Sequence, residues 1–334
     1  MNYKFRNLVF EGGGVKGIAY GGALKLLQES GYLTDIIRVA GTSAGAINAT
    51  LLALGFSTED VSRIIAETNF ASFEDHSRFL PSNIARILNK FGWNKGDAFK
   101  NWMGDLIKSK AGKTDFTFGE LEEEITGGNV KSFKYLYVAS TNLQQQSRVV
   151  FSHEPERYKN LAIKDAVRMS MSIPLYFAAF NYESDLYVDG GVSYNFPINL
   201  FDEKRYLVNI ANGEETKKDN IEHIFNHETL GFRLDSSAVI EYAKRDWASP
   251  PEKINGIKTY AGALLNFMME MANKSHLDSN DWNRTIFIDT LDVKTTDFQL
   301  PIEKINALIA SGEKGVKDYF AWRNKNKKWA AVPV

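Results

Sequence analysis

Residues 8 to 54 read LVFEGGGVKGIAYGGALKLLQESGYLTDIIRVAGTSAGAINATLLAL, and this stretch decides the fold. Leu8–Phe10 is a short apolar strand, and Ile18–Gln28 carries leucines among small residues, as a helix does. The apolar run at Ile36–Ala40 predicts a second strand, and the alanine-rich Ala44–Ala53 predicts a second helix. Strands joined through a helix by short loops pair in parallel with a right-handed crossover, so this stretch predicts an α/β fold.

A glycine loop, GGGVKG at residues 12–17, follows the first strand. Gly12, Gly14 and Gly17 fit the G-x-G-x-x-G spacing of dinucleotide-binding folds, which also need an acidic residue where the second strand ends. The acid nearby, Asp35, lies at the start of that strand, and no Lys-Ser or Lys-Thr follows Gly17 as in a P-loop. Nucleotide binding is therefore the weaker alternative. Consecutive glycines can instead turn backbone N–H groups toward an oxyanion, which the N-terminus of the following helix also favours.

A serine lies at the second turn, within Gly41-Thr42-Ser43-Ala44-Gly45. The G-x-S-x-G pattern between a strand and a helix is typical of a nucleophile elbow, in which a strained turn exposes the hydroxyl and small neighbours let other backbone approach. The pattern also occurs by chance, but here a glycine loop follows the neighbouring strand. We expect Ser43 to be a nucleophile, and the alternative is an ordinary N-cap serine.

A serine nucleophile needs a base, and the sequence offers two kinds. His223 and His227 follow Asp189 in the chain order of an α/β-hydrolase triad, although their acid-rich segment has no strand before it. Asp189 is itself the other candidate, because it ends a short apolar strand, Leu186–Val188, and two glycines follow it. A free carboxyl with a pKa of about 3.9 is a poor base, and shielding from water would raise that pKa. The spacing alone leaves open whether Asp189 is a base or part of a turn.

The composition limits the classes of function. The 334 residues carry a formal net charge of -1 and a sequence pI of about 6.6, so no overall field attracts nucleic acid or anionic lipid. The absence of cysteine excludes disulfides, thiolate metal sites and cysteine nucleophiles. No apolar run reaches a signal-peptide core or the roughly 18 residues of a membrane helix. We expect a soluble, cytoplasmic protein with no nucleic-acid partner.

The remaining chain continues the α/β pattern without a repeat or a clear linker, and its apolar periodicity predicts further elements. Thr117 and Glu120 match a capping box at the start of a helix. Strands are expected at Phe133–Ala139, Arg148–Phe151, Tyr206–Ile210 and Thr285–Ile288, and helices at Ile84–Phe91, Phe99–Ile107, Leu161–Met171 and Ile302–Ala310, with no strand between about 70 and 112.

A wide apolar stripe at helical spacing runs through Ile257–Ala272. We expect this helix to face the core, and the alternative is a surface that contacts lipid. With no clear domain boundary, we predict one domain over residues 1–334, with a catalytic core at about 5–210 and a C-terminal extension at about 211–334.

Three blocks carry a resemblance to a known family: GGGVKG at 12–17, GTSAG at 41–45 and Asp189-Gly190-Gly191. In this order they resemble the signature blocks of patatin-like phospholipases, and shorter matches at Met169–Phe177 and Asn195–Pro197 extend the resemblance over about residues 5–210. The resemblance implies a three-layer α/β sandwich with a central, mostly parallel sheet and helical insertions over the active site. It also implies a Ser-Asp dyad that works without a catalytic histidine, a metal or a cofactor.

The resemblance assigns roles position by position. Ser43 would be the nucleophile and Asp189 its base, with Gly12, Gly13 and Gly14 as the oxyanion loop. The supporting positions would be Lys16, near the lipid phosphate, and Gly17, Gly41, Gly45, Gly190 and Gly191. The implied reaction is hydrolysis of fatty-acyl esters of glycerophospholipids, with peripheral contact to a membrane. The alternatives are a Ser-Asp-His carboxylesterase and a non-catalytic acyl- or membrane-binding module, and the sequence does not give the oligomeric state.

Overall fold

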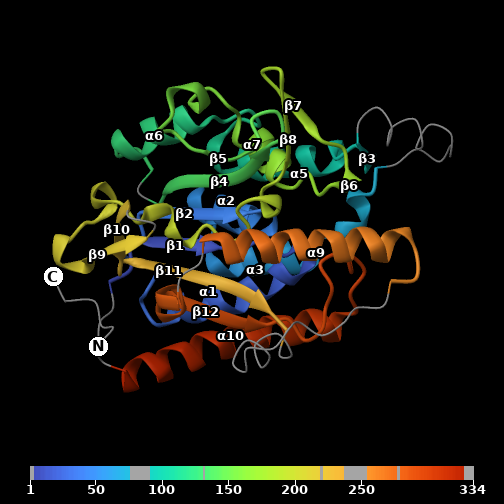
Figure 1. Cartoon of the computed structure of the whole chain (residues 1–334). Coiled ribbons are helices and arrows are strands. Elements are labelled where there is room, and N and C mark those ends of the chain that lie inside the picture. The colour runs from blue at the N-terminus through green and yellow to red at the C-terminus, as the bar shows by residue number, and fades with distance from the viewer. Residues whose placement is uncertain are drawn as a thin grey trace.

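A mostly parallel sheet runs through the centre of the protein (Figure 1). The computed structural model describes residues 4–75, 91–130, 132–218, 221–236, 254–276 and 279–326. The strands of the sheet are β1 (Asn7–Phe10), β2 (Arg38–Thr42), β4 (Tyr135–Asn142), β5 (Ser147–Phe151), β7 (Phe180–Tyr182), β8 (Asp185–Asp189), β11 (Thr229–Asp235) and β12 (Thr285–Asp289). Among the described residues their order is β12-β11-β1-β2-β4-β8-β7, and β5 also pairs with β4.

The direction of the strands confirms the predicted α/β class. The five strands from β12 to β4 are parallel, as expected for β1 and β2, whereas β5 and β8 run antiparallel to β4 and β7 runs antiparallel to β8. Two small sheets accompany the large one: β9 (Gly213–Lys218) with β10 (Ile221–Asn226), and β3 (Gly92–Asn94) with β6 (Leu175–Phe177).

Alternating side chains give the sheet two buried faces. In β1, Leu8 and Phe10 belong to one apolar core, and Val9 between them belongs to another. Successive residues of a strand point to opposite faces, so a strand that is apolar throughout must be covered on both sides. The same alternation in β2 and β4 extends both cores across the sheet.

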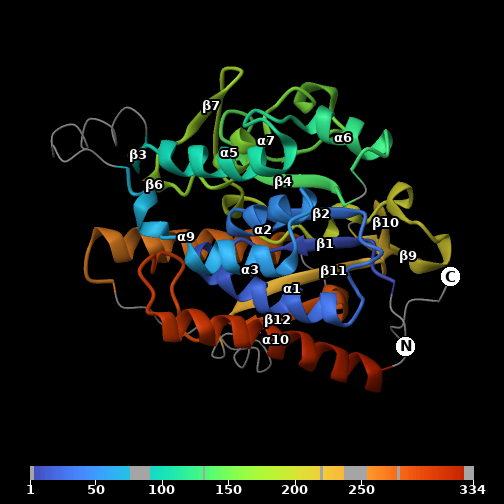
Figure 2. The ribbon, with the colours of Figure 1, turned by 180° about the vertical axis from the view of Figure 1, so that it is seen from behind.

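Helices cover the face of the sheet that carries Leu8 and Phe10. Figure 2 shows these helices in the view from behind. There α2 packs on β1, β2 and β4, while α1 packs against α3 and α10. On the second face lie the segment from Phe196 to Tyr206 and, in front of the sheet in Figure 1, α9. The protein therefore has three layers, as expected. The helices are α1 (Ala19–Glu29), α2 (Ala44–Ala53), α3 (Thr58–Glu67), α5 (Asp97–Ala111), α6 (Phe118–Thr126), α7 (Ile163–Ser170), α9 (Ile257–His276) and α10 (Ile302–Lys325).

The strand expected at Tyr206–Ile210 is wrong. Short 3-10 turns at Lys204–Tyr206 and Ile210–Asn212 flank an irregular segment. The carboxylate of Glu228 accepts the N–H groups of Val208 and Asn209 at 2.8 and 2.9 Å, so a side chain takes the place of a neighbouring strand. Because Ile210 is 85% exposed, the apolar residues of this segment do not form a buried strand.

Other differences concern short or irregular segments. β3 forms in the region that was expected to have no strand, because it pairs with β6 from a distant part of the chain. Most of the helix expected at 84–91 lies outside the described residues. β11 and β12 follow residue 210 yet extend the central sheet beyond β1. The sheet around the glycine loop is therefore completed by the C-terminal part of the chain.

Candidate active site

Two strand ends meet at the same edge of β4. Residues Tyr135–Ala139 of β4 pair with β2, and Ser140–Asn142 pair with β8, while β5 occupies the opposite edge. Thr42 is opposite Ala139, and Asp189 is opposite the next residue, Ser140. β2 and β8 therefore approach each other end to end, which places Ser43 beside Asp189.

Ser43 has a strained backbone. Its φ of 53° and ψ of -123° lie where side-chain-bearing residues are rare and cost about 1 to 3 kcal/mol. Close packing leaves no room for side chains at its neighbours: a Cβ on Gly41 would lie 2.3 Å from the carbonyl carbon of Gly45, and one on Gly45 would lie 2.4 Å from the Phe10 oxygen. This is the geometry of the predicted nucleophile elbow.

The end of α7 holds the serine from the other side. The N–H of Ser43 donates to Oγ of Ser170 at 2.8 Å, and that hydroxyl donates to the carbonyl of Ala139 at 2.6 Å. The hydroxyl of Ser43 donates to Sδ of Met171 at 3.3 Å. A thioether is a weak acceptor, so the hydroxyl gives up little when it turns to a better one. Our sequence reasoning missed Ser170 and Met171, although both lie in the Met169–Phe177 match.

Asp189 is a buried carboxyl, and one of its two oxygens accepts no hydrogen bond from the described residues. Burial raises its pKa to about 7, while the nearby Ser43 hydroxyl and the N–H of Gly191 oppose the rise. Gly191 donates its N–H to Oδ1 at 2.7 Å, whereas Oδ2 has no hydrogen-bond partner among the described residues. A Cβ on Gly190 would lie 2.4 Å from the Ala139 oxygen, so the Asp-Gly-Gly sequence lets the chain turn directly against β4.

The glycine loop presents some of its N–H groups and uses others. The N–H of Gly12 donates to the carbonyl of Asn195 at 3.0 Å, and that of Val15 donates to the carbonyl of Thr295 at 3.2 Å. The N–H groups of Gly13 and Gly14 have no acceptor among the described residues. Gly12 also lies beside the nucleophile, since a Cβ on it would be 3.2 Å from Cβ of Ser43.

The same contacts weaken the nucleotide alternative. Phosphate binding at a helix N-terminus needs several adjacent N–H groups, and Thr295 already occupies the one on Val15. The Thr295 oxygen lies 2.1 Å from where a Cβ on Gly14 would be, and Gly14 has a φ of 58°, so only glycine fits there. Gly17 packs close to Ala44, with 3.1 Å between the two Cβ positions. Lys16, directly before Gly17, is half-buried.

The structure does not bring His227 to Ser43. His227 comes two residues before Thr229, which pairs with Asn7 at the start of β1, and Asn7 pairs with Arg38 at the start of β2. Ser43 follows the far end of β2, so the two positions are roughly 16 Å apart along the strands. Nε2 of His227 lies 3.5 Å from the Glu214 carboxylate instead. The backbone of His223 lies in the same β9–β10 hairpin, so the expectation that no strand precedes these histidines is wrong: β10 ends at Asn226, directly before His227.

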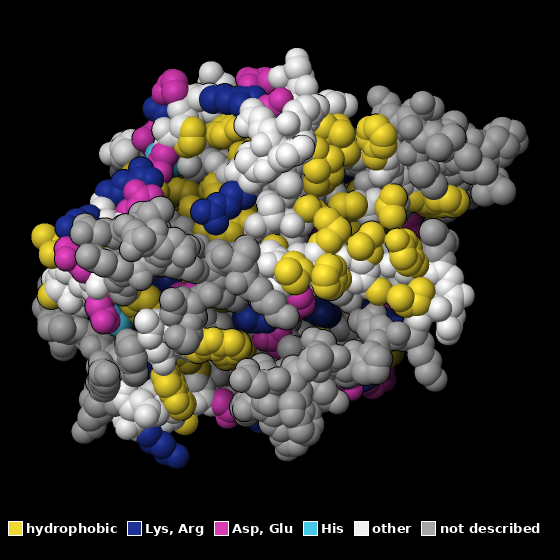
Figure 3. Space-filling model, in the orientation of Figure 1, with side chains coloured by type: hydrophobic (Ala, Val, Ile, Leu, Met, Phe, Trp, Pro, Cys, Tyr) yellow, Lys and Arg dark blue, Asp and Glu magenta, His cyan; other side chains and the backbone are white. Residues whose placement is uncertain are grey.

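The outer face of α9 is exposed, so the expected core-facing stripe is wrong for this side of the helix. Tyr260, Leu264, Phe267 and Met271 are between 40% and 62% exposed. Figure 3 shows apolar side chains gathered over α9, with more above it. The spacing predicted an amphipathic helix, but it did not predict which side of the helix would pack on the protein.

The opposite side of α9 packs on the candidate site. Its residues Ala272 and Asn273 are buried, and Cγ of Met269 lies 3.2 Å from where a Cβ on Gly191 would be. Ser43 and Asp189 are themselves only 3% and 2% exposed. The helix therefore forms part of the cover over both predicted catalytic residues.

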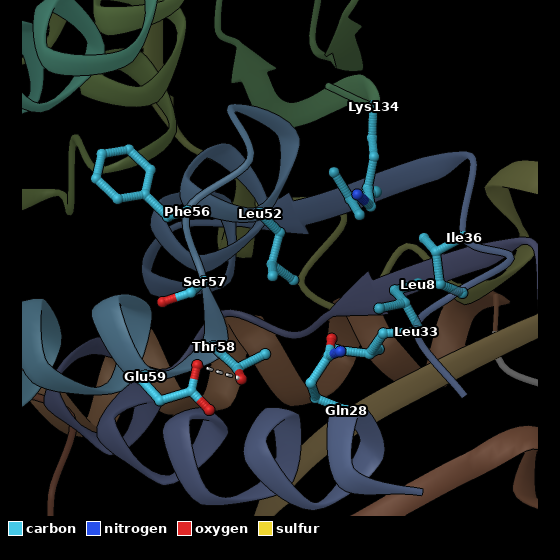
Figure 4. Close-up of a pocket in the computed structure, with 11 residues that line it drawn as sticks. Leu8, Gln28, Leu33, Ile36, Leu52, Phe56, Ser57, Thr58, Glu59 and Lys134 are labelled. Atoms are coloured by element: carbon cyan, nitrogen blue, oxygen red, sulfur yellow. Dashed lines mark hydrogen bonds between the residues drawn. The ribbon is translucent and has the colours of Figure 1, made fainter. Parts of the chain in front are cut away.

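A cavity of about 420 Å³ opens at the other end of the sheet (Figure 4). Leu8 and Val39 come from the starts of β1 and β2, whereas Ser43 follows the end of β2. None of the predicted site residues lines this cavity. The remaining lining residues are Gln28, Leu33, Ile36, Leu52, Phe56, Ser57, Thr58, Glu59 and Lys134.

The described residues contain no group of three or more His, Cys, Asp or Glu side chains arranged to hold a metal ion. Among the helices in these ranges, none combines the length and apolar character needed to cross a membrane.

Comparisons with known proteins identify the family of this chain. The family model for patatin-like phospholipases matches residues 8–202. The uncharacterized protein YqhO of Bacillus subtilis is 30% identical over 318 residues, which cover 92% of this chain and 94% of YqhO. A probable lipid hydrolase of Invertebrate iridescent virus 6, 463L, is 26% identical over 198 residues, which cover 59% of this chain and 63% of the relative.

Solved structures with the same fold include two bacterial proteins. VipD from Legionella pneumophila matches with a TM-score of 0.57 and 18% identity, over 95% of this chain and 67% of VipD. ExoU from the type III secretion system of Pseudomonas aeruginosa, solved in complex with SpcU, matches with a TM-score of 0.55 and 17% identity, over 99% of this chain and 54% of ExoU. At these identities the likeness concerns the fold.

Proposed function

The chain belongs to the patatin-like phospholipase family, and we propose that it hydrolyses fatty-acyl esters of glycerophospholipids with Ser43 and Asp189. One observation carries the proposal: consecutive residues of β4 pair with Thr42 and with Asp189, so the strained serine and the buried carboxyl adjoin. A nucleophile beside a base of matched pKa is what acyl transfer to a serine needs. The family and the viral lipid hydrolase relative support a lipid ester as the substrate.

In the first step Oγ of Ser43 attacks the ester carbonyl carbon, and its proton passes to Oδ2 of Asp189. The pKa of about 7 makes Asp189 a far better acceptor for this proton than an ordinary carboxyl. The tetrahedral oxyanion then accepts hydrogen bonds from the N–H groups of Gly13 and Gly14. Because the N–H of Gly12 is already bonded to Asn195, we assign Gly12 the role of placing the loop and not of a donor.

In the second step the tetrahedral intermediate collapses and the C–O bond to the lysolipid breaks. Asp189 returns its proton to the departing alkoxide oxygen, which leaves an acyl ester on Ser43. Water then gives a proton to Asp189 and attacks this ester, and the same N–H groups hold the second oxyanion. Release of the fatty acid returns the proton to Oγ of Ser43, so the cycle consumes one water molecule per ester.

The dyad is tested by assay of Ser43→Ala and Asp189→Asn on a phospholipid with a labelled acyl chain, with a fluorophosphonate probe to report the nucleophile. We expect the probe to label the wild type at Ser43, and both variants to lose hydrolysis by about a thousandfold or more. Full activity in Asp189→Asn would refute the dyad.

The alternatives give different results in the same assay. Loss of activity in His223→Ala or His227→Ala, with Asp189→Asn less affected, would favour a Ser-Asp-His carboxylesterase. A non-catalytic binding module would bind lipid, fail to react with the probe at Ser43 and release no fatty acid.

We also propose that the outer face of α9 contacts the lipid surface that holds the substrate. The outer face of α9 carries exposed aromatic and aliphatic side chains, and the inner face of the same helix contacts Gly191. Changing Leu264 and Phe267 together to serine should weaken binding to phosphatidylcholine vesicles by about tenfold or more and leave hydrolysis of a soluble ester unchanged. Ile302→Ser on α10, 59% exposed in the wild type, is the matched control. Equal vesicle binding by both variants would refute this role.

A further inference from the structure

A buried carboxyl lies directly before the glycine loop, at the end of β1. Glu11 is 2% exposed, although carboxylates are seldom fully buried. Its Oε1 accepts hydrogen bonds from Nδ2 of Asn195 at 3.1 Å and Nδ2 of Asn273 at 2.8 Å, and its Oε2 accepts the N–H of Leu234 at 2.8 Å. Tyr20 donates its hydroxyl to the backbone carbonyl of Glu11 at 2.7 Å. The mechanism above uses none of these contacts.

Each of the two asparagines belongs to a segment that contacts Gly191, two residues after Asp189. Asn195 follows Asp189 by six residues. It also binds the loop directly, since its carbonyl accepts the N–H of Gly12 at 3.0 Å and its Nδ2 lies 3.3 Å from the Gly12 oxygen. Asn273 belongs to α9, the helix that contacts Gly191 through Met269. One carboxyl thus joins the glycine loop, the Asp189 loop and the covering helix.

The titratable groups around Glu11 lie on three elements. Arg233 and Asp235 lie on β11, with Nε of Arg233 at 4.0 Å from Oε1 of Glu11, Glu270 lies on α9, and Tyr20 lies on α1. Burial raises the pKa of Glu11, Arg233 opposes that rise, and Asp235 adds to it. A buried carboxyl in such surroundings costs stability unless its hydrogen bonds are retained, so a purely structural role would be served as well by apolar packing.

We propose that Glu11 is a positioning residue, which holds Asn195 and Asn273 together and so fixes the N–H groups of Gly13 and Gly14 relative to Ser43 and Asp189. The inference rests on the proposed function, because it assigns Glu11 a part in ester hydrolysis. Glu11 itself touches no reacting atom. Misplacement of catalytic groups by about 1 Å can slow a reaction about a hundredfold, so the effect of losing this junction is measurable.

The test compares Glu11→Gln with Glu228→Gln on a soluble p-nitrophenyl ester. The two carboxylates are matched: Glu228 is 1% exposed, one of its oxygens accepts from an asparagine Nδ2 and a backbone N–H, and the other accepts one backbone N–H. In each case glutamine keeps one acceptor and sets its NH₂ against a donor. Glu228, however, precedes Thr229 at the start of β11, whereas Glu11 adjoins the glycine loop at the opposite end of β1.

For Glu11→Gln we expect kcat to fall about 10- to 100-fold with KM changed less than about threefold. We expect Glu228→Gln to lose about as much stability as Glu11→Gln, because both set an amide NH₂ against a donor. Its kcat per folded molecule should be unchanged. Asn195→Ala should lower kcat as Glu11→Gln does, and the double variant should be little worse than either alone, because both break the same junction. Asn273→Ala removes one donor only and provides a milder variant if Glu11→Gln folds poorly.

Equal kcat values in Glu11→Gln and Glu228→Gln, per molecule labelled by the fluorophosphonate, would overturn the inference while the proposed function stands. Independent, multiplying effects of Glu11→Gln and Asn195→Ala would overturn it as well. Absence of Ser43-dependent hydrolysis in the wild type would overturn the proposed function itself and this inference with it.

Discussion

Replacing Asp189 by asparagine should abolish hydrolysis and make the folded protein more stable. The carboxyl is 2% exposed, and burial raises its pKa from its usual 3.8 to about 7. Between these two values the folded state keeps a proton that the unfolded chain has released, so stability falls as the pH rises through this window. Above the window the ionised carboxyl has cost about 4 kcal/mol. Asparagine removes this cost and keeps an oxygen to accept the Gly191 N–H.

The measurement is denaturant unfolding of the wild type and of Asp189→Asn at about pH 8 and about pH 4, together with ester hydrolysis. We expect the variant to be more stable by about 4 kcal/mol at the higher pH and equal to the wild type at the lower one. Asp185→Asn is the control on the same strand, because hydrogen bonds from Asn142 and Arg157 lower the pKa of Asp185. That variant should lose stability at the higher pH and not gain it.

Two results would refute this reasoning. If Asp189→Asn is no more stable than the wild type at about pH 8, burial of the charge does not carry the cost assigned to it. If the variant is stabilised but still hydrolyses esters, the carboxyl is buried and costly without being the base, and the dyad is wrong.

Three further predictions concern the same turn and loop. The kcat/KM of the wild type for a soluble ester should rise about tenfold per pH unit below about 7 and level off above it, because Asp189 must be ionised to accept a proton; a flat profile from pH 5 to 8 would exclude this base. Ser43→Gly should be more stable than Ser43→Ala by about 1 kcal/mol in denaturant unfolding, since glycine adopts a φ of 53° without strain, and both should be inactive. Gly45→Ala should lose about 1 to 3 kcal/mol of stability or more, because its Cβ would lie 2.4 Å from a backbone oxygen, whereas Gly262→Ala on α9, with open space around it, should gain up to about 1 kcal/mol; similar effects of the two would contradict the packing argument.

Local patterns were sufficient for the elements that local interactions stabilise. The helix predicted at Ala44–Ala53 has these bounds in the structure, and the capping box of Thr117 and Glu120 is present with both of its hydrogen bonds. The glycines at positions 41 and 45 around the serine also predicted a turn in which backbone segments approach closely. No residue with a side chain fits at either position.

Predictions failed where a partner distant in the sequence decides the structure. The segment Tyr206–Ile210 has apolar letters typical of a strand, but the Glu228 side chain binds its N–H groups and leaves no ladder to form. The stripe on α9 showed an amphipathic helix, but the choice of which side faces the sheet depends on Met269 and Asn273 meeting Gly191 and Glu11. Neither contact has a local signature.

By itself, the sequence determined the α/β class, the parallel β1–β2 unit, the serine turn and the glycine loop, since spacing, apolar periodicity and glycine geometry act over short distances. Only the tertiary structure decided that β8 runs against β4 and ends beside Ser43, that Gly12 uses its N–H on Asn195, and that Glu11 joins the glycine loop to α9. Those features depend on strand register and on hydrogen bonds between residues up to 262 positions apart. The chain can satisfy such bonds only once the sheet has brought their donors and acceptors together.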